Sequence, residues 1–325
     1  MPASQGNRDP SSRMSSGADQ QVSSTMTFIE SWDQTTKGNP FYRSAPSPGF
    51  ETVNFKWVDN PVTISNTRPF RDRFTLDENG FAYVDDPDGS SHEILQAIRE
   101  GDKELVKDIY YPKVQALVKR VTGAGRVIIF DHTLRKRNPA RDKKENADGK
   151  EQPATTVSTS SHLSMRILAL TSHEQGALRR LRQNLDPEDD YDNIIRNRVQ
   201  MIKTRADCQI FSVWRPLNGP VVDWPLAQMD FTTLDAAHVH PCDLWRGKYE
   251  ERGQTVTIEH HPNQKWWYLE GHRSDEVTLL KIWDSCSDRG LATMCAHAAF
   301  QHPHTPHGAV PRESVEVRCL VLYDG

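Results

Sequence analysis

The chain has 325 residues, of which 26% are charged, and its formal net charge is -4 at neutral pH. A chain of this length can bury a sizeable core in one or two compact units, and its modest charge argues against nucleic-acid binding as the main role. It has no apolar run of about 18 residues and no apolar N-terminal segment, so neither a membrane span nor a secretory signal is predicted.

The five cysteines are an odd number and include no Cys-x-x-Cys pair. This pattern fits a reduced compartment better than a disulfide framework, so we expect a cytoplasmic protein.

Residues 1–25 are rich in Ser, Gln, Gly and Asp and have few large apolar groups. Such a segment cannot offset the entropy of ordering, and a disordered tail is predicted.

A single domain is predicted over residues 26–325. Its first part, residues 26–131, contains short β-branched and aromatic segments separated by Pro, Asp and Gly, which indicate strands at 53–58, 61–64, 81–84 and 127–130. A helical pattern runs from 91 to 120, with Pro112 expected to break or kink it.

The second part, residues 132–207, begins with a charged stretch over 135–156 that predicts a solvated surface loop. A helical pattern over 175–205 follows it. The third part, residues 208–325, is strand-like, and several short strands with turns between them predict a sandwich or barrel. The strands are expected at 210–214, 255–258, 266–269, 277–283 and 315–322. In the last of these, Glu316 and Arg318 alternate with apolar neighbours.

His297 is the first candidate for a metal ligand. It stands among three small alanines, which would let a metal or ligand approach the backbone. The alternative is a histidine packed in the core or exposed at the surface. A second group, His302, His304 and His307, resembles a metal-binding tract, but the interleaved prolines favour a loop.

Arg312 and Ser314 are candidates for binding an anion. A guanidinium can grip a carboxylate with two parallel hydrogen bonds, which lysine cannot do. Ser314 shares the strand face of Arg312, because strand side chains repeat with a period of two. The alternative is a surface arginine at the start of a strand.

Tryptophans beside prolines are candidates for the wall of an apolar pocket. The segments are Trp214-Arg215-Pro216 and Trp224-Pro225. Trp283, at the end of an apolar strand, is a third candidate for the pocket lining. The alternative is a corner of the core.

Together these segments resemble the fungal and bacterial hydroxylase/desaturase family, which includes aspergillic-acid hydroxylase/desaturase and gibberellin A4 desaturase-like proteins. The similarity covers residues 53–323, and its clearest motifs are Trp-Arg-Pro-Leu at 214–217, Ala-His-Ala-Ala-Phe at 296–300 and Arg-Glu-Ser-x-Glu-x-Arg at 312–318.

The resemblance implies an α+β protein with a double-stranded β-helix (jelly-roll) core and flanking helices. It also implies an Fe(II)/2-oxoglutarate-type oxidoreductase that hydroxylates or desaturates a small hydrophobic natural product in secondary-metabolite biosynthesis. In that family pattern His297 binds iron, Arg312 holds the far carboxylate of 2-oxoglutarate, and Ser314 adds a hydrogen bond.

The chain departs from the family pattern at one place. Family members read Val-His-x-Asp-Gln-Ser, whereas here serines follow Val157 and an extra segment occupies about 161–170. A facial iron triad needs two imidazoles and a carboxylate, and serine hydroxyls are poor iron ligands. Three explanations stay open. His162, or His173 with Glu174, could supply the missing ligands, the redox chemistry could be lost, or misread sequence could have replaced the motif.

If the redox chemistry is lost, the scaffold would serve a metal-independent isomerase or cyclase. His132 would then be a general acid or base, because imidazole titrates near neutral pH. The third class of function is that of a non-catalytic partner subunit beside an active homologue. A homo- or hetero-dimer is compatible with the sequence. Replacing His297 with Ala should abolish an oxygenase but spare a metal-free enzyme.

Overall fold

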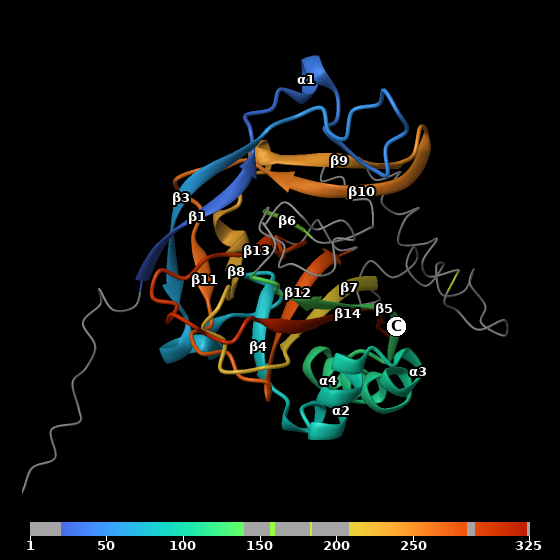
Figure 1. The fold of residues 1–325 in the computed structure, drawn as a ribbon, viewed down its shortest axis with the longest axis vertical. Helices are drawn as coiled ribbons and strands as arrows, with labels where there is room; N and C mark the ends of the chain where they lie inside the picture. Colours follow the sequence, from blue (N-terminus) through green and yellow to red (C-terminus); the bar gives the residue numbers. More distant parts are fainter. Residues whose placement is uncertain (1–20, 140–156, 160–182, 184–207, 285–289, 324–325) are drawn as a thin grey trace, which may run out of the picture.

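The computed structural model describes residues 21–139, 157–159, 183, 208–284 and 290–323. Over these residues the chain forms a nine-stranded and a five-stranded β-sheet, with the helices of residues 92–122 gathered at one end (Figure 1). Among the described helices, none is long and apolar enough to cross a membrane.

The nine-stranded sheet has the order β1-β3-β11-β8-β13-β6-β10-β9-β2. Its strands are β1 (Gln21–Ile29), β2 (Phe41–Ser44), β3 (Trp57–Asn66), β6 (Ser158–Thr159), β8 (Leu226–Met229), β9 (Val239–Arg246), β10 (Glu250–Ile258), β11 (Trp266–Tyr268) and β13 (His297–Ala299). The short strands β8, β13 and β6 lie at its centre, and every residue of β8 and β13 is buried.

The five-stranded sheet has the order β4-β12-β7-β14-β5, and all its pairings are antiparallel. Its strands are β4 (Phe81–Asp85), β5 (Arg126–Lys136), β7 (Cys208–Pro216), β12 (Glu276–Asp284) and β14 (Glu313–Leu322). One face of this sheet packs on the helices and the other on the nine-stranded sheet.

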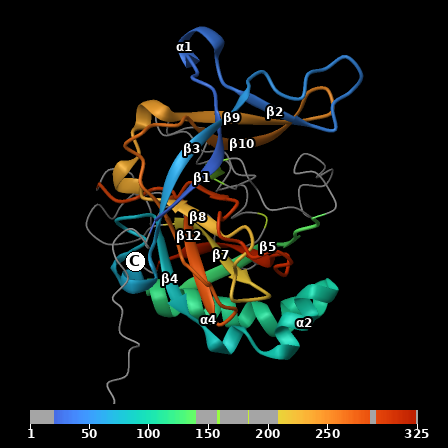
Figure 2. The same ribbon diagram turned by 60° about the vertical axis from the view of Figure 1, so that its left-hand side comes forward.

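The helices α2 (His92–Glu100), α3 (Lys103–Leu105) and α4 (Tyr111–Thr122), with the π-helix η4 (Val106–Tyr110), cover the outer face of the five-stranded sheet. Figure 2 shows α2 and α4 at the opposite end of the molecule from β9, β10 and the short helix α1 (Gln34–Lys37). Aliphatic residues of α2 and α4 share one apolar cluster with alternate residues of β7, β12 and β14.

The predicted helix over 91–120 is interrupted, but not at Pro112. The helix α2 ends at Gly101, whose φ of 73° suits a left-handed C-terminal cap. Pro112 instead lies in the first turn of α4, where a missing backbone N–H leaves no hydrogen bond unmade. The position of the break was therefore wrong, although the helical residues were identified correctly.

Three other boundaries differ from expectation. The strand β1 begins at Gln21, inside the segment predicted as a tail, because it pairs along its whole length with β3. Residues 53–56 precede β3 rather than forming a strand. The strand β5 continues to Lys136, into the predicted loop, because β14 supplies a partner as far as Glu313. The predicted helix over 175–205 lies outside the described residues, Gln183 excepted.

The two sheets face each other across a buried interior. An apolar cluster combines Trp214 and Leu280 of the five-stranded sheet with Leu226 of the other sheet. A direct hydrogen bond also joins the sheets, since the Tyr83 hydroxyl on β4 donates to Oε1 of Gln228 on β8 at 2.7 Å. The candidate site lies in this interior.

Candidate active site

The strand β14 has one apolar and one polar face, and both are buried. The apolar residues pack in the helix-side cluster: Val315, Val317 and Cys319. The polar residues, Ser314, Glu316 and Arg318, point into the interior between the sheets. The predicted alternation is therefore confirmed, but its polar face is a buried row of functional groups rather than a solvated surface.

Glu316 is at the centre of this row. Its Oε1 accepts hydrogen bonds from the Ser212 hydroxyl at 2.7 Å and from Nε of Arg318 at 3.3 Å. Burial alone would raise the pKa of Glu316, but Arg318, His297 and Arg135 outweigh it and hold the pKa at about 2. The carboxylate is therefore ionised at neutral pH.

His297 opens β13 and is only 7% exposed. Its Nδ1 lies 2.9 Å from the carbonyl oxygen of Cys295. A carbonyl can only accept, so Nδ1 carries the proton and Nε2 keeps the lone pair that a metal would use. Burial lowers the pKa of His297 although Glu316 opposes the shift, and the imidazole is neutral at physiological pH.

The strands beside β13 place two residues in register with His297. Gln228 of β8 pairs with it on one side, and Ser158 of β6 pairs with it on the other. Gln228 is fixed by the hydroxyl of Tyr83 from the opposite sheet. Ser158 stands where the family pattern has a histidine. It therefore pairs directly with His297, the one residue that matches a metal ligand of that pattern.

Arg312 is 2% exposed and lies beside the same interior. Its backbone N–H donates to Oδ2 of Asp223 at 3.0 Å, its Nη1 donates to the carbonyl of Trp224 at 2.5 Å, and its guanidinium lies 5.5 Å from the centre of the Trp214 ring. Burial and then Arg135 lower the pKa of Arg312 to about 9.

Two polar atoms here have no hydrogen-bond partner within the part of the chain that the structure describes. They are Nε of Arg312 and Oγ of Ser314, and both are buried. A buried polar atom without a partner costs about 1–3 kcal/mol. These two atoms therefore mark a place where a ligand with acceptor oxygens would fit.

The segment before β8 holds Arg312 in this position. Asp223 accepts from Nη1 of Arg137 at 2.7 Å as well as from the Arg312 backbone. Trp224 has a φ of 46°, which is unusual for a bulky residue. In this conformation its carbonyl accepts from Arg312, so the local backbone strain serves to position the guanidinium.

Several predicted site residues are brought together. His297, Ser314 and Trp214 face the interior, and Arg312, over the Trp214 ring, is hydrogen-bonded to the buried Trp224. Trp283 is also in contact with the interior apolar clusters. It pairs with Ile210, four residues before Trp214 on β7, which is ~13 Å along the strand.

Two predicted site residues point to the other face of the five-stranded sheet. His132 pairs with Val317 on the helix side, and its Nδ1 lies 2.7 Å from the Tyr111 hydroxyl. Arg215 pairs with Val315, and its guanidinium bonds the Tyr110 hydroxyl and Asp86. Because alternate residues of a strand point to opposite faces of the sheet, neither side chain reaches the interior. The predictions of His132 as an acid or base there, and of Arg215 in the pocket lining, are therefore corrected. His162 lies outside the described residues.

The sequence analysis did not identify four residues of the site. Arg135 was assigned to a loop, and Tyr83, Gln228 and Asp223 carried no motif that marks them singly. Tyr83 and Gln228 share one signal, since each is a polar residue within a strand of largely apolar character. This signal could have found Gln228 and Tyr83, but not their mutual contact.

The metal-binding capacity of the described residues is limited. His297 is a suitable ligand, but in the described parts of the chain no group of three His, Cys, Asp or Glu side chains could hold a metal ion. Two of the three positions of a facial triad are therefore not supplied there.

Comparison with known proteins gives a consistent result. The family model described as "Oxidoreductase/YMDC permease-like domain" matches residues 26–322. The Fe(II)/2-oxoglutarate-dependent dioxygenase nvfI of Aspergillus novofumigatus is 36% identical over 92% of this chain and 96% of its own length. The hydroxylase/desaturase CTB9 of Cercospora beticola is 30% identical over 83% of this chain and 78% of its own length.

A closer but shorter match is aspirochlorine biosynthesis protein N of Aspergillus oryzae, which is 54% identical over 46% of this chain and 58% of its own length. The solved structure of the iron and alpha-ketoglutarate-dependent endoperoxidase NvfI matches 94% of this chain and all of that chain, with a TM-score of 0.75 at 34% identity. The chain therefore belongs to the oxidoreductase family of the matching model, together with the Fe(II)/2-oxoglutarate-dependent dioxygenase nvfI.

Proposed function

We propose that this chain is an Fe(II)/2-oxoglutarate-dependent dioxygenase that hydroxylates or desaturates a small hydrophobic natural product of fungal secondary metabolism. We also propose that its two facing sheets form a double-stranded β-helix. Support for both comes from the match to nvfI over nearly the whole of each chain and from the fold that the two structures share.

One observation carries the proposal. Nε of Arg312 and Oγ of Ser314 are buried and unpaired among the described residues, on the strand face that also bears Glu316 beside His297. The far carboxylate of 2-oxoglutarate would accept from both atoms and neutralise the guanidinium. Arg135 and Arg137 add positive charge near Arg312, which favours an anion in the same place.

The residues present fit 2-oxoglutarate well and iron in part. His297 would hold the metal through Nε2, and His162, the second ligand expected from sequence, lies outside the described residues. Bound iron would supply the oxidising power that the side chains lack, while the protein supplies geometry and a dry pocket.

The chain's own residues would bind and orient. The Cys295 carbonyl fixes the proton of His297 on Nδ1, which keeps Nε2 available as a metal ligand in the neutral state. Asp223 and the Trp224 carbonyl fix Arg312. Trp214 underlies the Arg312 guanidinium, and with Trp224 it would line the substrate pocket and exclude water.

The proposal is tested by the conversion of 2-oxoglutarate to succinate in air with added Fe(II). Oxygenases of this type consume 2-oxoglutarate slowly without their substrate, so the wild-type chain should form succinate. His297→Ala should form none, and Arg312→Gln should require at least tenfold more 2-oxoglutarate. A folded wild-type protein that forms no succinate would contradict the proposal.

A further inference from the structure

A second pair of buried polar atoms lies in the interior, apart from Arg312 and Ser314. His272 is 4% exposed and Thr278 is fully buried. Nε2 of His272 and Oγ1 of Thr278 have no hydrogen-bond partner within the described part of the chain. Each such atom points to a polar partner that is missing among the described residues.

The surroundings place both atoms on the same interior wall. In the register of the five-stranded sheet, Thr278 on β12 stands between Trp214 on β7 and Tyr83 on β4. The His272 ring lies 5.1 Å from the Trp214 ring and 6.4 Å from the Tyr83 ring, measured between centroids. Because the Trp214 ring also underlies Arg312, this wall borders the anion site.

His272 offers a lone pair and not a proton. Its ring donates to the Glu276 backbone carbonyl, and this leaves Nε2 as the unprotonated nitrogen. Burial and the nearby Arg68 and Arg215 lower the pKa of His272 to about 3. The unpaired nitrogen therefore accepts hydrogen bonds at any physiological pH.

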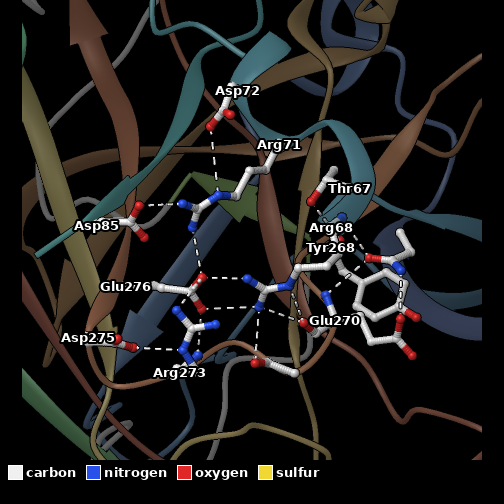
Figure 3. A network of polar contacts seen from close by, with 12 residues as sticks. Thr67, Arg68, Arg71, Asp72, Asp85, Tyr268, Glu270, Arg273, Asp275 and Glu276 are labelled. Carbon is white, nitrogen blue, oxygen red and sulfur yellow. Dashed lines mark hydrogen bonds and ion pairs between the residues drawn. The ribbon is translucent and has the colours of Figure 1, made fainter.

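An ionic cluster holds this histidine in place. Figure 3 shows Glu276, fully buried at the start of β12, between the guanidinium groups of Arg68, Arg71 and Arg273. Arg68 also donates to the Glu270 carbonyl, on the turn that leads to His272. The cluster thus fixes the turn that leads to His272.

We propose that Nε2 of His272 and Oγ1 of Thr278 form a subsite for an uncharged hydroxyl group of the substrate. The inference rests on the proposed function, since the substrate is the one that would occupy this interior. A hydroxyl donates to His272 and accepts from Thr278, so it satisfies both atoms at once.

Other functional groups fit less well. A carboxylate or a ketone has no hydrogen to donate to His272, and an ammonium group has no lone pair to accept from Thr278. The substrate class is therefore a hydrophobic, uncharged natural product that already carries an alcohol. The same chemistry could come from a trapped water, and the experiment below distinguishes the two.

The first part of the test uses protein stability. Thr278→Val keeps the side-chain volume and removes the unpaired hydroxyl, and His272→Phe removes the unpaired nitrogen. If these atoms bind a ligand, Thr278→Val should unfold at the same or a higher temperature than the wild type. The reason is that a methyl group replaces a buried hydroxyl that has no hydrogen-bond partner. Clear destabilisation of Thr278→Val would point to a structural role and overturn the subsite.

The second part uses two small probes, cyclohexanol and methoxycyclohexane, in ligand-observed NMR titrations of the full chain. The wild type should bind cyclohexanol about three- to tenfold more tightly, which corresponds to one neutral hydrogen bond. Thr278→Val and His272→Phe should lose this preference. Thr122→Val, whose hydroxyl is already bonded to the Val118 carbonyl on α4, should keep it.

The outcomes separate the subsite from the proposed function. Equal binding of the two probes by the wild type would overturn the subsite, and so would a crystal structure with a water on both atoms that cyclohexanol does not displace. Succinate formation is measured on the same proteins. A probe preference without succinate formation would contradict the oxygenase while keeping the subsite, and the reverse result would overturn the subsite alone.

Discussion

Charged side chains gather in the interior of this protein instead of at its surface. Glu316, Arg318, Arg312 and His297 are each less than 10% exposed. Burying a charge is costly unless it is paired and hydrogen-bonded, and Glu316 meets this condition through Ser212 and Arg318. The Arg312 guanidinium does not meet it among the described residues, because its hydrogen bond goes to a backbone carbonyl and not to a carboxylate. We therefore expect a bound anion to complete its environment.

The role of Arg312 is tested by Arg312→Lys. A lysine keeps the charge but cannot form the two parallel bonds of a guanidinium, so KM for 2-oxoglutarate should rise at least tenfold while kcat changes less. Ser314→Ala should raise KM by a smaller factor. Steady-state succinate kinetics measure both, with Arg120→Lys on the exposed face of α4 as the control. Unchanged KM in Arg312→Lys would contradict the assignment.

The charge of Glu316 should appear in the acid stability of the protein. Its folded pKa of about 2 lies below the ordinary glutamate value of 4.5, so the unfolded chain binds the proton more readily. The stabilisation is therefore complete above about pH 4.5 and is lost as the pH falls toward 2. Glu316→Gln should lower the free energy of unfolding at pH 7 by about 3–5 kcal/mol, because it leaves buried arginine charge uncompensated.

Chemical denaturation between pH 2 and pH 7 measures this effect. Glu313→Gln is the matched control, since it lies on the same strand but pairs with the exposed Arg99 and Lys136. The difference in stability between wild type and Glu316→Gln should shrink as the pH falls, whereas Glu313→Gln should differ little throughout. A pH-independent difference for Glu316→Gln would contradict the ionised state.

Sequence motifs single out residue types with a specific chemistry, and in this way they point to His297, Arg312 and Ser314. All three are buried at the interior, and their roles there stay predictions. His132 and Arg215 were misplaced because each has a suitable side chain, but only strand pairing decides which face it occupies.

At the scale of elements, the site depends on how closely the segment before β13 approaches β4. The Lys281 N–H donates to the Gly80 carbonyl, and the Cys295 N–H donates to the Lys281 carbonyl. A Cβ on Gly80 would lie 2.4 Å from the Met294 carbonyl oxygen, too near for any side chain. Gly80 therefore permits the packing that places His297.

Gly80→Ala tests this contact, and Gly49→Ala is its matched control. The two glycines have nearly the same φ, 81° and 83°, but nothing lies within 4 Å of a Cβ on Gly49. Both substitutions should cost about 1 kcal/mol for the left-handed backbone. Gly80→Ala should cost about 1–3 kcal/mol beyond this for the clash and should impair succinate formation. Equal losses of unfolding free energy in the two variants would show that the close approach is unimportant.

Elements were predictable where local sequence determines them. Apolar alternation identified the strands at 210–214, 277–283 and 315–322, and each lies inside a longer observed strand. The boundaries were less predictable because a distant strand decides them. The strand β5 runs through Arg135 and Lys136 only because β14 continues beside it.

At the scale of the molecule, the site combines segments that are distant in sequence. His297 is beside Gln228 in one sheet, and across the interior Glu316 is beside Trp214 in the other. The parallel pairing of β3 with β11 joins residues some 200 positions apart. A jelly-roll was expected from the resemblance, but no local pattern could supply the strand order or the juxtaposition of the two sheets.

The central claim is that this interior binds Fe(II) and 2-oxoglutarate together, although serine stands at the register position beside His297. An anaerobic titration of the purified protein with Fe(II) and 2-oxoglutarate tests it most directly, through the visible metal-to-ligand charge-transfer band. We predict a saturable band at one iron per chain that is absent in His297→Ala and needs more 2-oxoglutarate in Arg312→Gln. A well-folded wild-type protein that develops no band would contradict the claim.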